Sequence, residues 1–265
     1  MITGAQEHLL SPSTMRSLIL SDIHGNLEAL EAVLEQSQRE SYDHTVVLGD
    51  LIGYGANPNE VVDRIFDLEP DLLIRGNHDK VASGVEEPLH FNPSAAKAAL
   101  WTYNTLTPAN RLRVANLPKG PLTLHSKIEI CHGTPYDEDV YIFDEQDASV
   151  ALDSASKQFC FFGHTHLPGI FSRESKSGPV TAFVPKTKTP GHQTKTLNPR
   201  ASHLINPGSI GQPRDGDPRA AYAIFDHVTN EAVFMRVTYP VKLAQEKIRI
   251  AGLPDSLARR LAQGR

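Results

Sequence analysis

Residues 16–26, RSLILSDIHGN, decide the fold that we expect for this 265-residue chain. The apolar run Ser17–Leu20 is typical of a buried strand, and it ends in a polar motif that contains Asp22 and His24. Leucine and alanine then recur at the 3.6-residue spacing of a helix from Leu27 on, while glutamates occupy the other side. The stretch therefore predicts a strand, a polar loop at its carboxyl end, and a helix.

The same arrangement recurs further along the chain. The runs Thr45–Leu48 and Leu72–Ile74 have strand character, and Asn59–Leu68 between them repeats the helical spacing. Two more runs, Lys127–Ile130 and Phe159–Phe162, also end in polar motifs. Alternating strands and helices predict a largely parallel sheet with right-handed crossovers. The strand ends then meet at one edge, where such sheets bind ligands.

The rest of the chain divides into helices and a strand-rich segment. Helical patterns occur at Ser94–Leu106, Ala109–Leu117, Glu145–Ser156, Lys242–Ile250 and Pro254–Ala262. Short strand patterns after residue 166 predict a second sheet and occupy Ile170–Ser172, Ser202–Ile205, Ala221–Phe225 and Ala232–Val237. Ser175–Pro199, rich in Lys, Thr, Pro and Gly, is expected to form a solvated loop or hairpin.

Composition narrows the class of protein. With 40% hydrophobic residues, 22% charged residues and a net charge of −5, the chain resembles an ordinary soluble protein and shows no basic stripe for nucleic acid or membrane lipid. No run approaches the ~18 apolar residues of a membrane span, and no basic segment precedes a long apolar region. Cys131 and Cys160 lie in apolar runs and are expected to be buried reduced thiols. We therefore expect a cytoplasmic protein.

Five polar motifs follow five apolar runs, and their residue types converge on metal binding. The motifs are Ser21-Asp22-Ile23-His24-Gly25-Asn26, Gly49-Asp50-Leu51-Ile52-Gly53, Gly76-Asn77-His78-Asp79, Cys131-His132-Gly133-Thr134 and Gly163-His164-Thr165-His166. Each alone is common turn chemistry. Carboxylate, imidazole and amide oxygen together suit first-row divalent ions such as Mn, Fe, Zn or Ni. Five in order, each at a strand end, indicate a metal site.

This series resembles the signature of calcineurin-like metallophosphoesterases, D-x-H, G-D, G-N-H-D/E, H and G-H-x-H, from Asp22 to His166. The segment Asn206–Arg219 is similar to one found in small bacterial members of that family. The resemblance implies an α/β fold, a four-layer α-β-β-α sandwich of two mixed sheets flanked by helices. We expect a single metallophosphoesterase domain over residues 15–265, preceded by a flexible N-terminal extension of residues 1–14.

The resemblance also implies two divalent metal ions. Asp50 would bridge them, because a carboxylate between two dications offsets part of their repulsion. The implied ligands of one ion are Asp22, His24, Asp50 and His166, and those of the other are Asp50, Asn77, His132 and His164.

His78 matches a family residue that faces the phosphate instead of a metal ion. We expect it to donate a proton or hydrogen bond to the leaving oxygen, with Asp79 orienting its ring; the alternative for Asp79 is a cap on the following turn. The implied reaction is hydrolysis of a phosphate mono- or diester by a metal-bound hydroxide, with manganese among the candidate metals. The expected substrate is a small phosphate ester.

Several alternatives stay open at the level of sequence. Arg214 and Arg219 lie in a loop where they could bind substrate phosphate or pair with aspartates, and Tyr54 and Asn26 are equally open. His125 is assigned to the surface. Other functional classes are a regulatory or scaffold protein with weak catalysis, and a nuclease. Retention of His78 argues against the first class, and the acidic balance argues against the second. A homo-oligomer is compatible with the sequence.

Overall fold

The structure is a computed structural model that describes residues 15–187 and 191–265, and these residues form two six-stranded sheets. The strands are β1 (Arg16–Leu20), β2 (His44–Val47), β3 (Leu72–Leu73), β4 (Leu122–Leu124), β5 (Ile128–Ile130), β6 (Phe159–Phe161), β7 (Gly169–Arg173), β8 (Val180–Phe183), β9 (His192–Thr196), β10 (Ser202–Asn206), β11 (Ala220–Asp226) and β12 (Glu231–Val237). The first sheet has the order β3-β2-β1-β11-β12-β9, and the second has the order β4-β5-β6-β10-β7-β8.

Both sheets are mixed. β1, β2 and β3 run parallel, whereas β11, β12 and β9 add antiparallel strands to the first sheet. In the second sheet β5, β6 and β10 are parallel, and β4, β7 and β8 are antiparallel to their neighbours.

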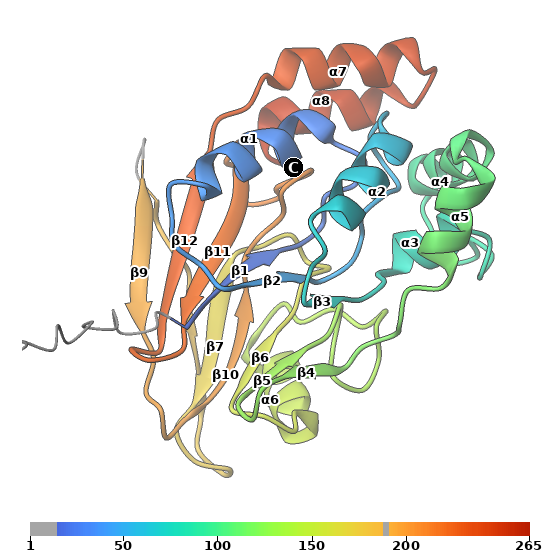
Figure 1. Cartoon of the computed structure of the whole chain (residues 1–265). Helices are drawn as coiled ribbons and strands as arrows, with labels where there is room; N and C mark the ends of the chain where they lie inside the picture. Colours follow the sequence, from blue (N-terminus) through green and yellow to red (C-terminus); the bar gives the residue numbers. More distant parts are fainter. Residues whose placement is uncertain (1–14, 188–190) are drawn as a thin grey trace, which may run out of the picture.

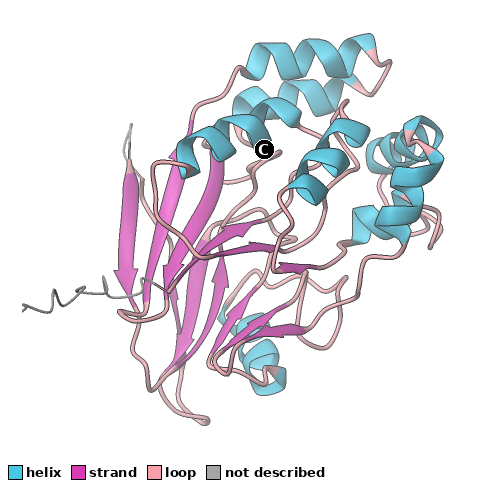
Figure 2. Ribbon diagram, in the orientation of Figure 1, coloured by secondary structure: helices cyan, strands magenta, loops and turns pink. Residues whose placement is uncertain are grey.

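Helices flank the two sheets (Figures 1 and 2). They are α1 (Leu27–Ser37), α2 (Pro58–Asp67), α3 (Asn77–Ala82), α4 (Pro93–Thr105), α5 (Pro108–Ala115), α6 (Glu145–Ser154), α7 (Val241–Ile250) and α8 (Asp255–Gln263). In Figure 1, α6 lies beside the second sheet and α1, α7 and α8 lie over the first. Helices α3, α4 and α5 lie to one side, next to α2.

Strand alternation explains the layers. In β1, Leu18 and Leu20 belong to the apolar cluster shared with α1, α2, α7 and α8, whereas Ile19 belongs to the cluster between the sheets. Phe161 of the second sheet and Phe225 of the first pack in that inner cluster, with ring centroids 5.3 Å apart. Because successive side chains of a strand point to opposite faces, each sheet is buried on both sides. The four-layer sandwich of two mixed sheets flanked by helices is confirmed.

The assignment of strands to sheets differs from the sequence-based expectation. β11 and β12 do not form a separate C-terminal sheet; they join β1, while β5 and β6 join β10. Ser175–Pro199 is not a simple loop or hairpin either, because it contains β8 and β9, which extend the edges of different sheets. The apolar pattern of a strand shows which of its faces are buried, but it does not identify the strand that pairs with it.

Capping side chains and prolines mark the starts of several helices. Side chains of Asn92, Thr107 and Asp144 accept hydrogen bonds from the first backbone N–H groups of α4, α5 and α6. Pro93 and Pro108 occupy first-turn positions, where no backbone donor is needed.

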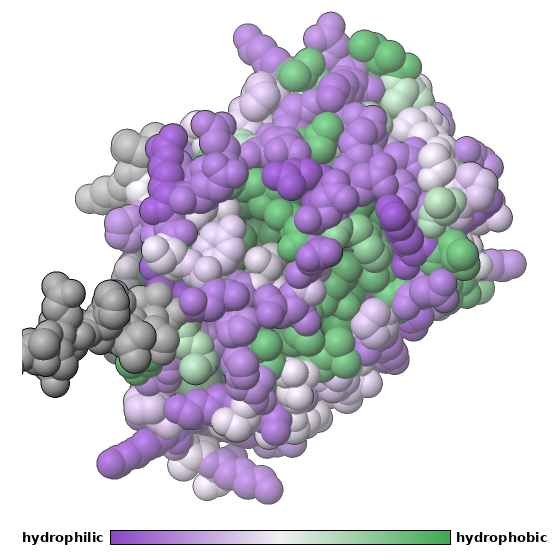
Figure 3. Space-filling view, viewed as in Figure 1, coloured by the Kyte–Doolittle hydropathy of each residue, from purple (hydrophilic) through white to green (hydrophobic). Residues whose placement is uncertain are grey.

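The surface and the termini complete the description. On the face in Figure 3, hydrophilic residues cover most of the surface and hydrophobic residues gather near the middle, over α2 and β3.

No helix within residues 15–187 and 191–265 has the length and apolarity needed to cross a membrane. The expected extension, residues 1–14, lies outside the described residues. Cys131 and Cys160 are buried and free, with their Sγ atoms 3.6 Å apart.

Candidate metal centre

The five polar motifs meet where strands of both sheets end. β1, β2 and β3 deliver the motifs of the first sheet, and β5 and β6 deliver those of the second. All the residues predicted as metal ligands are buried: Asp22, His24, Asp50, Asn77, His132, His164 and His166. The fold thus brings together side chains that are up to 144 positions apart, from Asp22 to His166.

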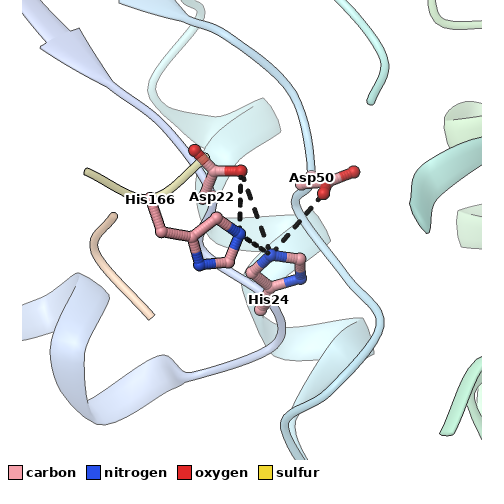
Figure 4. Close-up of side chains that lie close together, drawn as sticks. All are labelled: Asp22, His24, Asp50 and His166. Atoms are coloured by element: carbon pink, nitrogen blue, oxygen red, sulfur yellow. Dashed lines mark hydrogen bonds and ion pairs between the residues drawn. The ribbon is translucent and has the colours of Figure 1, made fainter. Parts of the chain in front are cut away.

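A first group of possible ligands consists of Asp22, His24, Asp50 and His166, with one ligand atom of each within 4.8 Å of the others. Figure 4 shows both imidazoles and both carboxylates turned toward one another. Nε2 of His166 lies 3.3 Å from Oδ1 of Asp22, and Nε2 of His24 lies 3.5 Å from Oδ2 of Asp50. Ligand atoms about 2.1 Å from one ion are about 3–3.4 Å apart, so these spacings fit a shared metal ion.

A second group consists of Asp50, His132 and His164. Nε2 of His132 lies 3.4 Å from Oδ2 of Asp50 and 3.2 Å from Oδ1 of Asn77, so the Asn77 amide joins this group. Asp50 belongs to both groups, and its Oδ2 atom faces a histidine of each. The two groups could therefore hold two ions that share one carboxylate.

Five of these ligand candidates have a left-handed backbone, which side chains other than glycine rarely adopt. Their φ angles are 53° at Asp22, His24 and Asp50, 66° at His164 and 62° at His166. Each such residue costs about 1–3 kcal/mol, and this kind of strain concentrates at functional sites. The repeated conformation turns each side chain out of its strand and toward the same point.

Backbone carbonyls fix the histidine rings. In three histidines the Nδ1 atom lies by a carbonyl oxygen and Nε2 faces the centre: His24 with Ile52 at 3.2 Å, His132 with Leu48 at 2.8 Å and His166 with Gln212 at 2.6 Å. A ring that donates through Nδ1–H has an unprotonated Nε2, which is the form that binds a metal ion. His164 is reversed, since its Nε2 lies 3.2 Å from the Asp139 carbonyl oxygen.

The two carboxylate oxygens of Asp50 have different surroundings. Oδ1 accepts a hydrogen bond of 2.8 Å from the backbone N–H of His78. Oδ2 is buried, and no described residue hydrogen bonds to it. A buried carboxylate oxygen without a donor is costly unless something else compensates its charge. A metal ion at this position would do so.

Burial and neighbouring charges shift the pKa values of the ligand candidates. Burial alone would raise the pKa of Asp50, but the charges of His132 and His78 outweigh it and hold the pKa well below the usual range. Burial would lower the pKa of His132, yet the Asp50 carboxylate raises it to about 10. Burial lowers the pKa of His24 and His166 well below normal. Near pH 7 the Asp50 carboxylate is therefore paired with a protonated His132, whereas the His24 and His166 rings are neutral.

His78 lies beside the two groups without belonging to either. Its ring contacts Tyr54, with centroids 4.3 Å apart, and Phe91, with centroids 4.5 Å apart. Its Nδ1 atom is buried without a partner among the described residues, which leaves Nε2 as the nitrogen that can reach a substrate. Gly53, at φ 131°, allows this ring to approach, because a Cβ there would lie 2.6 Å from Nδ1. Burial lowers the pKa of His78 to about 4, so its ring is a neutral hydrogen-bond donor near pH 7.

Asp79, which we expected to orient the His78 ring, accepts hydrogen bonds from two backbone N–H groups. Its Oδ1 accepts from the backbone N–H of Ile52 at 3.2 Å, and its Oδ2 accepts from that of Gly76 at 3.0 Å. Both oxygens are therefore used to cap α3 and to fix the loop after β2, which is the alternative that the sequence left open.

The two arginines have different surroundings. Arg219 pairs with Asp217, with Nη2 2.6 Å from the carboxylate, so it stabilises its own loop. Arg214 makes no ion pair with a described residue; its Nη2 donates to Oε1 of Gln212 at 3.3 Å, and its guanidinium lies 6.0 Å from the Tyr54 ring centroid. Its charge acts on the centre, because it opposes the burial that raises the pKa of Asp22 to about 6.

Two other open residues and the surface residue His125 have the following contacts. Asn26 caps α1 through Ala29 and donates to the Gly211 carbonyl, so its role is structural. Tyr54 is buried against His24 and His78. His125 is exposed, as expected. Sequence reasoning missed Tyr141, whose ring stacks on His164 with centroids 3.7 Å apart; no motif marks it.

Comparison with known proteins gives this arrangement a family. The pattern of the calcineurin-like phosphoesterase superfamily domain matches residues 15–230. The chain belongs to that superfamily. This confirms the resemblance carried by the five motifs, and membership supports a phosphoric ester hydrolase with buried Asp and His groups that could hold metal.

Relatives match 80–96% of the length of this phosphoesterase. An uncharacterised protein of Methanocaldococcus jannaschii is 37% identical over 257 residues, which cover 93% of this chain and 97% of that protein. The phosphodiesterase YfcE of Escherichia coli is 25% identical over 223 residues, or 80% of this chain and 88% of YfcE. A metallophosphoesterase structure from Sphaerobacter thermophilus has a TM-score of 0.84 at 36% identity and covers 96% of this chain and 100% of that one.

Proposed function

We propose that this phosphoesterase hydrolyses a phosphate mono- or diester at a centre of two divalent metal ions. The observation that carries the proposal is the position of Asp50, which belongs to both ligand groups and has a buried Oδ2 atom without a hydrogen-bond partner among the described residues. A carboxylate in that position suits the bridge of a two-metal site.

We assign the metal-binding and substrate-binding roles to different residues of the chain. One ion would be held by Asp22, His24, Asp50 and His166, and the other by Asp50, Asn77, His132 and His164. When bound, such ions activate water as a nucleophile and offset negative charge on the phosphoryl oxygens. Nε2 of His78 would donate a hydrogen bond to the leaving oxygen, and Arg214, which has no carboxylate partner among the described residues, would bind a phosphoryl oxygen.

The proposed substrate is a small phosphate ester in the cytoplasm, with no role for nucleic acid. The net charge of −5 and the absence of a basic stripe in the sequence disfavour a nuclease. A purely regulatory protein would have no chemical need for His78 beside the ligand groups.

A substrate screen tests the proposal. The purified protein, stripped of metal and then supplied with Mn²⁺, Fe²⁺, Zn²⁺ or Ni²⁺, is assayed on nitrophenyl mono- and diesters. We expect hydrolysis that a chelator abolishes and added metal restores. Tight metal binding without hydrolysis of any ester would instead favour the regulatory alternative, and hydrolysis that is indifferent to chelation would refute the metal centre.

A further inference from the structure

Three histidines lie together at the end of the sandwich opposite the candidate centre. They are His44, which begins β2, His125, in the turn between β4 and β5, and His227, which follows β11. The ring centroids of His44 and His125 are 4.9 Å apart, and that of His227 lies 6.3 Å and 6.0 Å from them. We call these three residues the histidine cluster. The function proposed above assigns it no role.

The histidine cluster spans both sheets. His44 and His227 lie in segments of the first sheet, whereas His125 lies in a hairpin of the second. The His125 residue is exposed, and the other two are partly exposed. A ligand can therefore reach the rings from solvent, without passing through the core and without entering the candidate centre.

The facing nitrogen atoms of His44 and His125 have the spacing of two ligands on one ion. The distance between their Nε2 atoms is 3.1 Å. Two nitrogen ligands that each lie about 2.0–2.1 Å from a metal ion are about 2.9–3.4 Å apart. A hydrogen bond between two imidazoles has a similar length, so the residues around the pair decide which interpretation fits better.

Asp71 holds the His44 ring in the form that binds a metal ion. Its Oδ1 lies 2.9 Å from Nδ1 of His44, and its Oδ2 accepts a 2.8 Å hydrogen bond from the backbone N–H of Thr45. Because an ionised carboxylate only accepts, Nδ1 of His44 carries the proton, and a neutral ring presents the lone pair of Nε2 to His125. A carboxylate behind the ring is the usual support of a metal-binding histidine.

His227 offers a third nitrogen ligand. Its Nε2 lies 2.7 Å from Oγ of Ser17, and among the described residues its Nδ1 has no hydrogen-bond partner. When Nε2–H donates to Ser17, the lone pair is on Nδ1. Three imidazoles on one tetrahedral ion have ring centroids about 5 Å apart, so His227 has to move toward the other two by about 1 Å. Val228 and Thr229, which follow it, are exposed, so no packed core opposes this shift.

We propose that the histidine cluster binds a first-row divalent ion such as Zn²⁺, with Nε2 of His44, Nε2 of His125 and Nδ1 of His227 as ligands and water in the remaining position. Imidazole nitrogen suits these ions, whereas Mg²⁺ and Ca²⁺ prefer oxygen ligands. The ion would link the two sheets at the end away from the centre. The inference does not depend on the proposed phosphoesterase function.

The position of the site sets its affinity relative to the centre. It is partly exposed and offers the ion no carboxylate ligand, whereas the ligand candidates of the centre are buried and include Asp22 and Asp50. We therefore expect the cluster to release its ion on a desalting column that leaves the centre loaded.

Zinc binding at equilibrium tests the proposal with the variant His125→Asn. Asparagine is too short to reach the ion, and it tolerates the left-handed backbone of this position, where φ is 57°. Wild type and variant are dialysed against the same series of free Zn²⁺ concentrations, and bound zinc is measured by elemental analysis. At saturation we expect the wild type to bind about one more ion per chain than the variant. Ions at the centre cancel in this difference, and the variant should hydrolyse esters at the wild-type rate.

His192→Asn is the matched control. It makes the same change at an exposed histidine of β9 that is not part of the cluster. This variant should bind as much zinc as the wild type.

Asp71→Asn tests the support behind His44. Asparagine keeps an acceptor for the Thr45 N–H but turns an amide N–H toward Nδ1 of His44, which moves the ring proton to Nε2. The dissociation constant of the additional zinc ion should rise about 10- to 100-fold, the usual effect of losing such a support.

The outcomes are distinct. Equal zinc binding by wild type and His125→Asn at every concentration would overturn the inference and leave a hydrogen-bonded pair of imidazoles. An equal loss of zinc in His192→Asn would overturn it as well, because binding would then be a general property of exposed histidines. Neither outcome bears on hydrolysis, which the substrate screen tests separately.

Discussion

The backbone N–H of His78 donates a 2.8 Å hydrogen bond to Oδ1 of Asp50, and this bond joins the proposed leaving-group donor to the proposed metal bridge. Asp50 lies in the motif after β2, whereas His78 lies in the first turn of α3 after β3. The bond fixes the Asp50 carboxylate so that Oδ2 faces His24 and His132. One side chain therefore sets the position of both ligand groups and of α3.

Asp50→Asn should harm the centre more than His24→Ala does. The asparagine keeps an acceptor for the His78 N–H but removes the charged oxygen that both groups share, whereas His24 serves one group. Loss of supporting residues around metal ions costs 10–100-fold, so we expect Asp50→Asn to retain less than about 1% of the wild-type rate. Rates measured at saturating metal, with metal content by elemental analysis, decide the point. Equal residual rates in the two variants would count against a bridge.

His78→Ala should show an effect that depends on the leaving group. A hydrogen bond to the departing oxygen helps most when that oxygen is strongly basic. We expect a loss on the order of 10²–10⁴-fold with an alkyl or nucleoside ester and a much smaller loss with a nitrophenyl ester, at unchanged metal content. Single-turnover rates are the measurement, because product release can mask chemistry in kcat. Equal losses with both esters would place His78 at the phosphoryl oxygens instead.

Arg214→Ala should weaken transition-state binding, with Arg219→Ala as its matched control. A charge-assisted hydrogen bond contributes about 1.5–3 kcal/mol, so kcat/KM should fall about 10- to 100-fold in the first variant. Arg219 pairs with Asp217, so its removal should lower stability and leave kcat/KM close to wild type. A reversed pattern would show that the loop arginines exchange roles.

His227 predicts a pH dependence of stability far from the motifs. Burial, and then the charges of His125 and His44, lower its pKa from 6.5 to about 4. Because the unfolded chain binds this proton more readily, the free energy of unfolding should fall as the pH drops from about 6.5 to about 4, and change no further below that through this group. The effect is moderated by solvent, since His227 is only partly buried.

The measurement for His227 is denaturant unfolding of wild type and His227→Gln at pH 7.5 and pH 5. We expect the wild type to lose more stability between these two pH values than the variant does. A larger loss in the variant would contradict the sign of the shift.

The sequence predicted the helices and strands better than it predicted which strands pair with one another. Pro58, Pro93 and Pro108 marked the starts of α2, α4 and α5 because proline suits the first helical turn. α3, of six residues, was missed because Asn77–Ala82 is too short for a helical period and carries a ligand motif. β8 and β9 were missed because edge strands such as His192–Thr196 are mostly exposed and need no apolar alternation.

The candidate site shows a similar division. Residue types and strand ends predicted a metal site where the five motifs meet, and the family resemblance implied which side chains gather around Asp50. The left-handed backbone at Asp22 or His164 has no local sequence signal, and the reversed ring of His164 follows from its contact with the distant carbonyl of Asp139. Contacts of this kind come from tertiary packing and leave no local signal.

The central claim is that two metal ions share Asp50, and the metal content of active protein tests it most directly. Elemental analysis of fully active wild-type protein, freed of loosely bound ions, is compared with analysis of the Asp50→Asn variant. We predict close to two divalent ions per chain in the wild type and loss of both in the variant. Full activity with a single ion per chain would contradict the account.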